Sequence, residues 1–327
     1  MLFDANGKIQ RIVPVQRNDA HKLIEECMLA ANVCSAKFLL KHNIDALYRV
    51  HEGPKEERLN TLRAFLAERG LALLGGEDPK PQHYKDVMSQ LGDRHDASII
   101  QTMMLRSMSQ AVYQPENKGH FGLDYDAYTH FTSPIRRYPD LLVHRAIRSV
   151  IRSDMPSKHV KRVEKLKPIK QEKSYPYDMA ALLAVGEQCS VTERRADEAS
   201  RDVVAWLKCE YLNDRIGEEF EGVISSVTSF GAFIELKDLF VEGLVHISSM
   251  GNDYYHFDSV KQRLVGERTH HVLQMGDLVN VVLNNVDLGE RKIDLGFKGR
   301  ERFKPEAPRG KPKKAGAKKS KSRRRKK

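Results

Sequence analysis

The sequence predicts an α+β protein in which a helix-rich part with short strands precedes a small β-barrel and a disordered basic tail. Through residue 213, apolar residues recur mainly at steps of three and four, the period of an α-helix. From 214 to 298 they alternate at every second position, the period of a β-strand. From 299 to 327 the chain is rich in Lys, Arg, Pro, Gly and Ala without any period. We therefore expect two folded domains, 1–213 and 214–298, and a tail, 299–327.

Composition excludes several classes of protein. The chain of 327 residues has no run of about 18 apolar residues and no apolar core of a secretion signal. This pattern excludes a membrane-spanning protein and indicates a soluble, cytoplasmic one without a membrane partner. The four cysteines form no Cys-x-x-Cys pair and lie in helix-like apolar patterns: Cys27, Cys34, Cys189 and Cys209. We expect them to be reduced core residues rather than metal ligands.

The positive charge lies almost wholly in the tail. Residues 298–327 contain 16 Lys and Arg against two acids, a net charge of +14, whereas the whole chain carries +11. Residues 1–297 are therefore slightly acidic. We expect the tail to bind polyanions without sequence preference, and a purely solubilising tail is the alternative.

The first helix is predicted over 19–41, after a strand-like start with a hairpin signal at Asn6-Gly7. Asn18 or Asp19 suits its N-cap. Glu25 and Glu26 flank its apolar face, and for at least one of them a solvated helix flank is the better interpretation. The predicted apolar face consists of Ala20, Ile24, Cys27, Met28, Ala31, Cys34 and Phe38.

Short elements are predicted between residues 46 and 132. The pattern favours strands at 46–51, 113–123 and 127–132 and helices at 54–68, 83–91 and 96–112. Met103 and Met104 on the last of these helices fit a hydrophobic core better than a ligand site.

The segment 130–140, His-Phe-Thr-Ser-Pro-Ile-Arg-Arg-Tyr-Pro-Asp, is the main candidate for chemistry. It is predicted to run from a strand into a helix start, with Ser133 at the N-cap and Pro134 at the first helical position. Arg136, Arg137 and Tyr138 then lie beside free backbone N–H groups at the positive end of the helix dipole. Such a start suits a phosphate. Two solvated arginines on a capped helix are an equally good interpretation. The turn at 134–138 should end where Pro139 begins the main helix, which should continue to about Ile151.

A long helix is predicted over 178–212, after an exposed connection at 152–176. Glu193, in its middle, is a candidate for the active site, and an ion pair with Arg194 or Arg195 on the helix surface is the alternative. The predicted apolar face consists of Leu182, Val185, Cys189, Thr192, Ala196, Ala199, Val203 and Trp206.

Five strands in about 85 residues favour an OB-type barrel. They are predicted at 220–227, 232–236, 243–247, 278–286 and 292–297, and the pattern does not explain the insertion at 249–275. Phe230 and Phe233 flank a glycine turn, which favours surface stacking on nucleic acid, although single phenylalanines are more often barrel core.

Two parts of the sequence resemble known families. The segment 130–140, followed by His144-Arg145, closely resembles the signature of the ribonuclease II/ribonuclease R family of 3′→5′ exoribonucleases. The resemblance implies that Arg136, with Arg137 beside it, contacts the region of the scissile phosphate, and that Ser133 and Tyr138 contribute to RNA binding. Similar runs in the family imply that Glu25 or Glu26 recognises the 3′-terminal ribose and that Glu193 lies near the active site.

The barrel region resembles the S1 RNA-binding domain in Glu221-Gly222-Val223, Phe230-Gly231-Ala232-Phe233, 243–248 and 286–293. This resemblance implies one RNA-binding face, formed by Phe230, Phe233, His246, Asp287 and Arg291.

The resemblance to the exoribonuclease family implies hydrolysis of single-stranded RNA to nucleoside 5′-monophosphates with Mg²⁺. It also implies that this chain corresponds to the C-terminal part of such an enzyme. However, the upstream aspartates that hold the metal in the family have no counterpart here; Asp4, Asp19 and Asp45 are scattered. Two hypotheses follow. The chain is part of an active exoribonuclease, or it is a non-catalytic RNA-binding remnant. We expect a monomer whose partners are single-stranded RNA and, as further candidates, a missing N-terminal half or ribosome and RNA-decay components.

Overall fold

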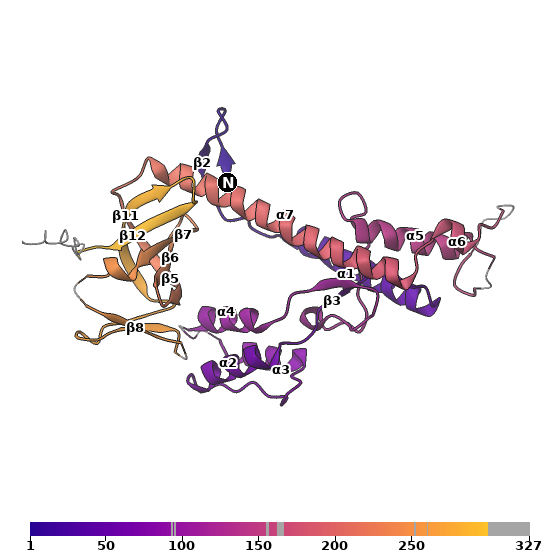
Figure 1. Ribbon diagram of the computed structural model, residues 1–327, viewed down its shortest axis with the longest axis horizontal. Coiled ribbons are helices and arrows are strands. Elements are labelled where there is room, and N and C mark those ends of the chain that lie inside the picture. The colour runs from indigo at the N-terminus through magenta and orange to yellow at the C-terminus, as the bar shows by residue number, and fades with distance from the viewer. Residues whose placement is uncertain are drawn as a thin grey trace, which may run out of the picture.

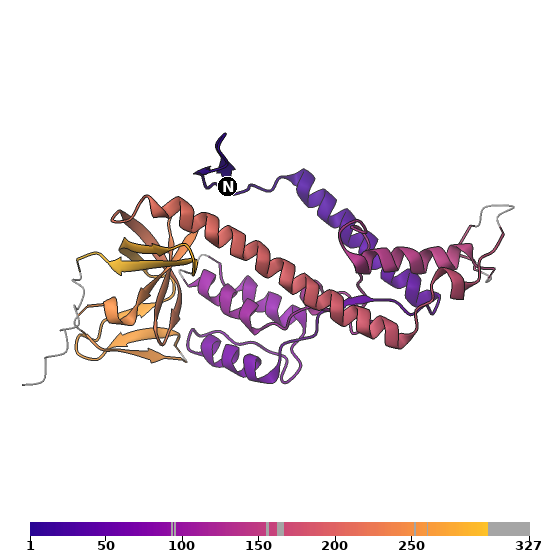
Figure 2. The same ribbon diagram turned by 45° about the horizontal axis from the view of Figure 1, so that its top comes forward.

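The long helix α7 joins the two folded parts of the molecule. The computed structural model describes residues 1–299 except 93, 95, 155, 156, 162–166, 252 and 260, so the predicted tail from 300 onward lies outside the described residues. α7 (Met179–Asn213) runs from a helical part to a β-barrel, and both views show it as the longest element (Figures 1 and 2). The predicted order of a helix-rich part followed by a barrel is confirmed.

Besides a small cluster of Ala36, Tyr48, Val50 and Ala127, the described residues of the helical part form two large cores. One forms where α1, α5 and α7 meet around Leu39, Leu142 and Leu182. The other lies among α2, α3 and α4, around Phe65 and Ile100. The elements are β1 (Leu2–Phe3), β2 (Ile9–Arg11), α1 (Asp19–Lys41), β3 (Tyr48–Val50), α2 (Glu56–Ala67), α3 (Pro81–Ser89), α4 (Ala97–Ser107), β4 (Val112–Gln114), η1 (Phe121–Leu123), α5 (Tyr138–Arg152) and α6 (Gln171–Ser174).

Two predicted strands of the helical part are wrong in extent. β4 covers only Val112–Gln114, so two residues of the predicted 113–123 are in a strand, and η1 follows at Phe121–Leu123. The segment 127–132 is irregular, although the Arg49 N–H donates to the Tyr128 carbonyl at 2.9 Å. The segment is held by side chains instead of by a strand ladder: the Thr129 hydroxyl donates to the Leu47 carbonyl at 2.6 Å, and Asn32 accepts from the Phe131 N–H at 2.9 Å. Backbone groups without a ladder partner are satisfied in this way.

The N-cap of α1 is correctly predicted, but its buried face is not. Asn18 accepts a hydrogen bond from the His21 N–H at 3.0 Å. The buried residues are Asn32, Ser35, Ala36 and Leu39, in the second half of the helix. The predicted apolar positions Ala20, Ile24, Cys27 and Met28 are exposed, because the first half of α1 extends away from the body (Figure 2). Cys34, in the second half of the helix, is also exposed. Cys27 and Cys34 are therefore not core residues; Cys189 is half-buried and only Cys209 is fully buried.

α7 is buried at its two ends and exposed in its middle. Near its start, Leu182, Gly186 and Ser190 form a buried face, which packs against β4. Gly186 is required there, since a Cβ would lie 2.6 Å from the Tyr113 carbonyl oxygen. Near its end, Cys209 and Leu212 belong to the barrel core. Residues 194–204 are exposed, so the prediction that Ala196, Ala199, Val203 and Trp206 continue the buried face is wrong.

The predicted barrel is confirmed. Its strands close in the order β11-β12-β7-β6-β5. They are β5 (Glu219–Thr228), β6 (Gly231–Leu236), β7 (Val241–His246), β11 (Leu278–Asp287) and β12 (Lys292–Phe297), with η2 (Ile247–Ser249) after β7. Alternate side chains fill the barrel, as the burial along β6 and β7 shows.

The insertion that the sequence pattern leaves unexplained forms a three-stranded sheet. β8 (Tyr255–Asp258), β9 (Arg263–Gly266) and β10 (Val272–Gln274) pair in the order β10-β9-β8. This sheet contributes Leu264 and Leu273 to the barrel core. It also reaches the helical part, where Ile99 of α4 packs against both cores and Lys261 pairs with Glu68 at 3.7 Å. The barrel is thus held by α7 and by a second contact through α4.

The end of α7 should be essential to the stability of the barrel. Leu212→Ala removes a side chain that is fully buried in the barrel core, so we expect a loss of about 2–5 kcal/mol in unfolding free energy. Leu183→Ala, at a 53% exposed position of the same helix, should cost less than about 0.5 kcal/mol. Urea unfolding followed by the fluorescence of the single tryptophan, Trp206, measures both. Equal losses would contradict this packing.

Candidate functional site

The segment before α5 forms a turn that is organised by a buried carboxylate. The N–H groups of Arg136 and Arg137 both donate to the Ser133 carbonyl, at 3.3 and 3.0 Å, and α5 begins at Tyr138. The turn followed by the main helix agrees with the prediction, but Ser133 is not the N-cap. Its N–H donates to Asp140 at 2.7 Å, and Arg137 occupies the N-cap position without a side-chain cap bond.

The two adjacent arginines differ in their surroundings. The Arg137 guanidinium donates to Asp140 at 2.9 Å, and the Asp140 side chain is fully buried. Arg136 is exposed, and its guanidinium has no hydrogen bond or ion pair with any residue of the described part of the chain. Arg137 therefore maintains the turn, because an unpaired buried carboxylate is costly, and Arg136 remains available for an anion. Tyr138 is 45% exposed, and its hydroxyl lies 3.3 Å from that of Tyr177.

Glu193 is held by a residue from a different element. Arg49 of β3 donates to its carboxylate at 2.6 Å, and both side chains are largely shielded from solvent. The Arg49 guanidinium also lies 4.6 Å from the ring centre of Tyr113. An ion pair with Arg194 or Arg195 is therefore not what the structure shows. Ser190, one turn before Glu193, accepts the Tyr113 N–H at 2.9 Å and fixes α7 against β4.

His130 connects this cluster to the arginine turn. Its Nδ1 lies 2.8 Å from the Tyr113 hydroxyl, which also lies 3.4 Å from the Glu193 carboxylate. Burial, followed by the charges of Arg137 and Arg49, lowers the pKa of His130 from 6.5 to about 3. His130 opens the predicted segment 130–140, whereas neither Arg49 nor Tyr113 was assigned to the site from the sequence. The only sequence signal was an arginine between the apolar residues Tyr48 and Val50 of a predicted strand.

The residues of this cluster do not fit a metal site. Within the described ranges, no group of three or more His, Cys, Asp or Glu side chains is arranged to hold a metal ion. The carboxylates of the cluster are already paired: Glu193 with Arg49, and Asp140 with Arg137. Magnesium needs several oxygen ligands that converge in octahedral geometry. These two carboxylates instead bind two different arginines. The arrangement instead suits an anion beside Arg136.

The barrel residues predicted for RNA binding lie on its surface. Phe230 is 46% exposed, it forms an edge-to-face pair with Phe233 at 5.9 Å, and neither ring belongs to the barrel core. His246 is exposed, with Nδ1 2.8 Å from the Ser248 hydroxyl. Asp287 accepts the Glu290 N–H at 2.9 Å, and Arg291 donates to Asp202 of α7 at 2.8 Å.

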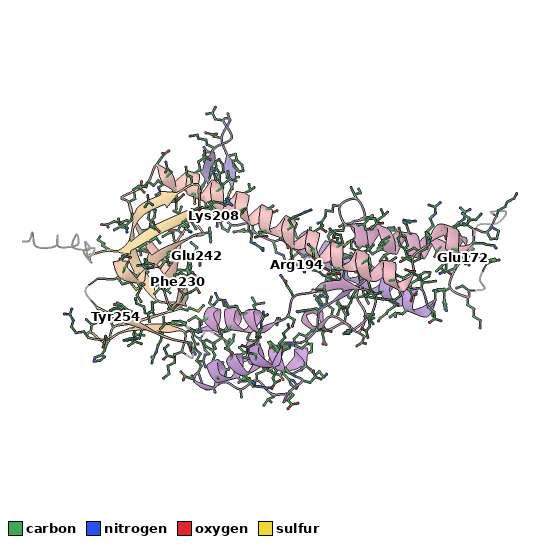
Figure 3. All side chains as sticks on the ribbon, in the orientation of Figure 1. Glu172, Arg194, Lys208, Phe230, Glu242 and Tyr254 are labelled. Carbon is green, nitrogen blue, oxygen red and sulfur yellow. The ribbon has the colours of Figure 1, made fainter. Side chains whose placement is uncertain are left out.

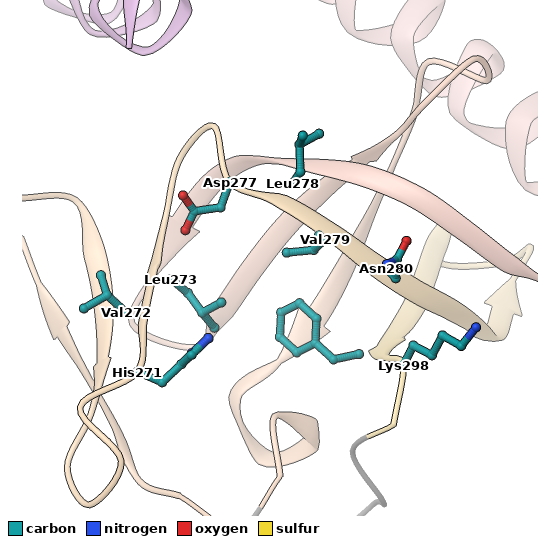
Figure 4. A pocket seen from close by; sticks show the side chains of 9 residues that line it. His271, Val272, Leu273, Asp277, Leu278, Val279, Asn280 and Lys298 are labelled. Atoms are coloured by element: carbon teal, nitrogen blue, oxygen red, sulfur yellow. The ribbon is translucent and has the colours of Figure 1, made fainter. Parts of the chain in front are cut away.

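A cleft of about 780 Å³ brings some of these residues together. It lies between α7 and the barrel and is lined by Phe230, Phe233 and Arg291, among others. In Figure 3, Phe230 and Glu242 lie on the side of the barrel nearest to α7 and Lys208. A second hollow, of about 460 Å³, lies at the other end of the barrel between β10, β11 and the end of β12 (Figure 4). It contains none of the predicted RNA-binding residues.

The two glutamates of α1 are not joined to the cluster. Glu25 forms an ion pair with Arg17, and Glu26 is exposed. No hydrogen bond or ion pair links either carboxylate to Arg136 or Glu193 in the described part of the chain. Their role at a ribose therefore stays a prediction.

The difference between the two arginines has a measurable consequence. Arg137→Ala leaves the buried Asp140 carboxylate unpaired and should lower the unfolding free energy by about 3–5 kcal/mol. Arg136→Ala changes an exposed residue and should cost less than about 0.5 kcal/mol. Urea denaturation followed by circular dichroism compares the two variants. A loss of stability in Arg136→Ala as large as in Arg137→Ala would show that both arginines are structural.

The low pKa of His130 predicts acid sensitivity. Unfolded histidine takes a proton near pH 6.5, whereas His130 takes one near pH 3 in the folded chain. The unfolded state binds more protons between these values, so stability should fall as pH falls from about 6.5 to about 3. NMR titration of the His130 ring should show no protonation at pH 5, and His130→Gln should reduce the pH dependence. A midpoint near pH 6.5 would contradict the prediction.

The comparisons with known proteins agree with both parts of the chain. An RNB-domain model matches residues 1–153 and an S1 RNA-binding-domain model matches residues 213–298. Ribonuclease R of Escherichia coli (strain K12) is 49% identical over 301 residues, which are 92% of this chain and 36% of that protein. Ribonuclease R of Vibrio cholerae is 53% identical over 294 residues, which are 90% and 35%. The chain spans about a third of the length of these two relatives.

The fold is also similar to a solved structure. Mycoplasma genitalium RNase R in complex with ribose methylated single-stranded RNA matches with a TM-score of 0.79 and 25% identity, over 90% of this chain and 44% of that one. Among the described residues, no helix is long and apolar enough to cross a membrane. The chain belongs to the ribonuclease R family, with RNB-domain sequence in residues 1–153 and an S1 RNA-binding domain in residues 213–298.

Proposed function

We propose that this chain supplies the phosphate-positioning and RNA-binding parts of a 3′→5′ exoribonuclease that hydrolyses single-stranded RNA to nucleoside 5′-monophosphates. The observation that carries the proposal is the exposed, unpaired Arg136 on a turn that Asp140 and Arg137 hold in place. A guanidinium that is free of other carboxylates can pair with a phosphate through two parallel hydrogen bonds. The relatives named ribonuclease R support the same assignment.

The roles of the other residues follow from their surroundings. Glu193 has a fixed orientation, because Arg49 and Tyr113 hold it from β3 and β4. It is suited to accept hydrogen bonds from a hydroxyl of a bound nucleotide. Burial keeps His130 neutral at physiological pH, so His130 adds no positive charge to the site. The exposed rings of Phe230 and Phe233 are suited to stack on bases of any identity.

A role for a metal ion is proposed only from the properties of the RNB family. RNB-family nucleases generally depend on a divalent metal, which activates the attacking water and stabilises the leaving oxygen. The carboxylates described above are paired with arginines and do not fit that role. We place the protein in the cytoplasm, as a monomer that acts with single-stranded RNA, on composition and family.

A non-catalytic RNA-binding protein is the second candidate function. It is favoured by the same pairing of Glu193 and Asp140 with arginines, which leaves the described residues without a metal-binding cluster. In that case the barrel and its aromatic face perform the function, and Arg136 only anchors the RNA backbone.

A chimeric enzyme separates the two candidates. Residues 1–299 replace the matching part of Escherichia coli ribonuclease R, to which this chain is 49% identical over 301 residues. If Arg136 stabilises charge that develops at the reacting phosphate, Arg136→Ala should lower kcat by about 10²–10³ with a smaller effect on RNA affinity. Arg148→Ala, at an exposed arginine within α5, is the matched control. Release of labelled monophosphates from single-stranded RNA measures turnover.

The outcome of the chimera experiment is decisive in both directions. An active chimera whose kcat is the same with Arg136→Ala as with Arg148→Ala contradicts the role of Arg136. A folded chimera that binds RNA without hydrolysing it favours the non-catalytic alternative.

A further inference from the structure

The cleft between α7 and the barrel has two different walls. The barrel wall contains Phe230 and Phe233, which the S1 resemblance already implies for RNA binding. The other wall is one face of α7: Ser200, Arg201, Val204, Ala205 and Lys208. These positions are separated by steps of one, three and four, so they lie side by side on the helix. Ser200, Arg201 and Val204 belong to the exposed middle of α7, whereas Ala205 and Lys208 are half-buried. All five lie beyond the residues that pack into the helical core.

Both walls are apolar in the middle. Phe230 is 46% exposed and Val204 is 41% exposed, which leaves both side chains accessible from the cleft. A ring on one wall and an aliphatic side chain on the other suit a flat, partly apolar group such as a nucleobase. The cleft volume of about 780 Å³ lies within the range of about 300–1,000 Å³ typical of small-molecule sites.

Cations outnumber carboxylates on the lining of the cleft. Four cations line it, Arg201, Lys208, Arg291 and Lys292, against two carboxylates, Glu242 and Asp294. Three of the cations already have partners in this chain: Arg291 pairs with Asp202, Lys292 pairs with Glu290, and Lys208 donates to the Phe240 carbonyl. The Glu242 carboxylate accepts a hydrogen bond from Ser225.

Arg201 is different from these three cations. Its side chain is exposed, and the described residues provide it with no hydrogen bond or ion pair. It is therefore the cleft cation that can bind a phosphate without first breaking a contact within the protein. A long cationic side chain next to an apolar wall is also the arrangement that holds a nucleotide by its phosphate and its base together.

We propose that α7 forms the second wall of the RNA-binding cleft, with Arg201 contacting a backbone phosphate and Val204 packing against a base opposite Phe230. This inference rests on the proposed function, since it takes single-stranded RNA as the ligand. It extends the binding site from the S1 domain to the helix that carries Glu193. From Glu193 to Arg201 is eight residues, or about 12 Å along the helix. The strand bound in the cleft is thereby directed towards the Glu193 and Arg49 pair.

Salt dependence of binding by the full chain tests the contact of Arg201. Each phosphate contact with single-stranded RNA contributes about 0.7 to the slope of log affinity against log salt. Arg201→Ala should lower the slope by about that amount, so that the parent loses about 2.6-fold more affinity than the variant between 50 and 200 mM salt. Arg201→Lys should retain the slope. The probe is an oligoadenylate of about 12 nucleotides, a length within the range of OB-fold sites.

Arg195→Ala is the matched control. It removes the same charge from an exposed position of the same helix, and at 3.6 residues per turn it lies roughly 120° around α7 from Arg201. We expect its slope to equal that of the parent. Trp206 fluorescence during urea unfolding verifies that each variant is folded.

A double variant tests whether both walls hold the same strand. Arg201→Ala and Phe230→Ala should weaken binding by less in combination than the product of their separate fold-changes, because each removes part of one shared site. If the parent binds RNA and Arg201→Ala behaves like Arg195→Ala, or if the two effects multiply, the cleft is not shared and the inference is wrong. If the folded parent does not bind RNA at all, the proposed function itself fails.

Discussion

The burial of α7 at both of its ends is the constraint on which the rest of the structure depends. At one end Gly186 lets the helix approach Tyr113, and Ser190 fixes that approach with a hydrogen bond. At the other end Leu212 is part of the barrel core. A helix of 35 residues is about 50 Å long, so the distance between the two domains is set by a stiff rod. The exposed middle of the rod then faces the cleft.

The chemistry of the site depends on contacts between elements that are distant in sequence. Glu193 on α7 is oriented by Arg49 on β3, and Tyr113 on β4 links that pair to His130. In the turn before α5, Asp140 forms an ion pair with Arg137, and the guanidinium of Arg136 remains free. Neighbouring residues of the same type therefore have opposite roles: one arginine stabilises the fold and the other is presented to the ligand. This division explains how a short basic motif can provide a single free guanidinium.

Much of the fold could be predicted from the sequence, because periodicity reports directly on helices and strands. The barrel strands, the N-cap Asn18 and the extent of α7 are examples. Burial was predicted less well: the apolar stripe of α1 and the residues Ala196 to Trp206 of α7 are exposed, since periodicity shows which residues share a face but not whether anything covers it. Arg49 could not be assigned to Glu193, because 144 residues separate them and no local pattern encodes such a contact. The sheet β8–β10 was missed for a related reason, as its strands of three or four residues are too short for a clear alternation.

The central claim is that one RNA strand runs from the aromatic face of the barrel along α7 to the turn at Arg136. Photo-crosslinking with 4-thiouridine at single positions of an RNA tests it directly, because the crosslinked peptide identifies the protein segment beside each nucleotide. We expect a 3′-terminal label to crosslink to the segment 130–138 and a label about eight nucleotides upstream to crosslink to Phe230 or to residues 200–208 of α7. Crosslinks to the barrel alone from both labels, or the opposite order along the chain, would contradict the account.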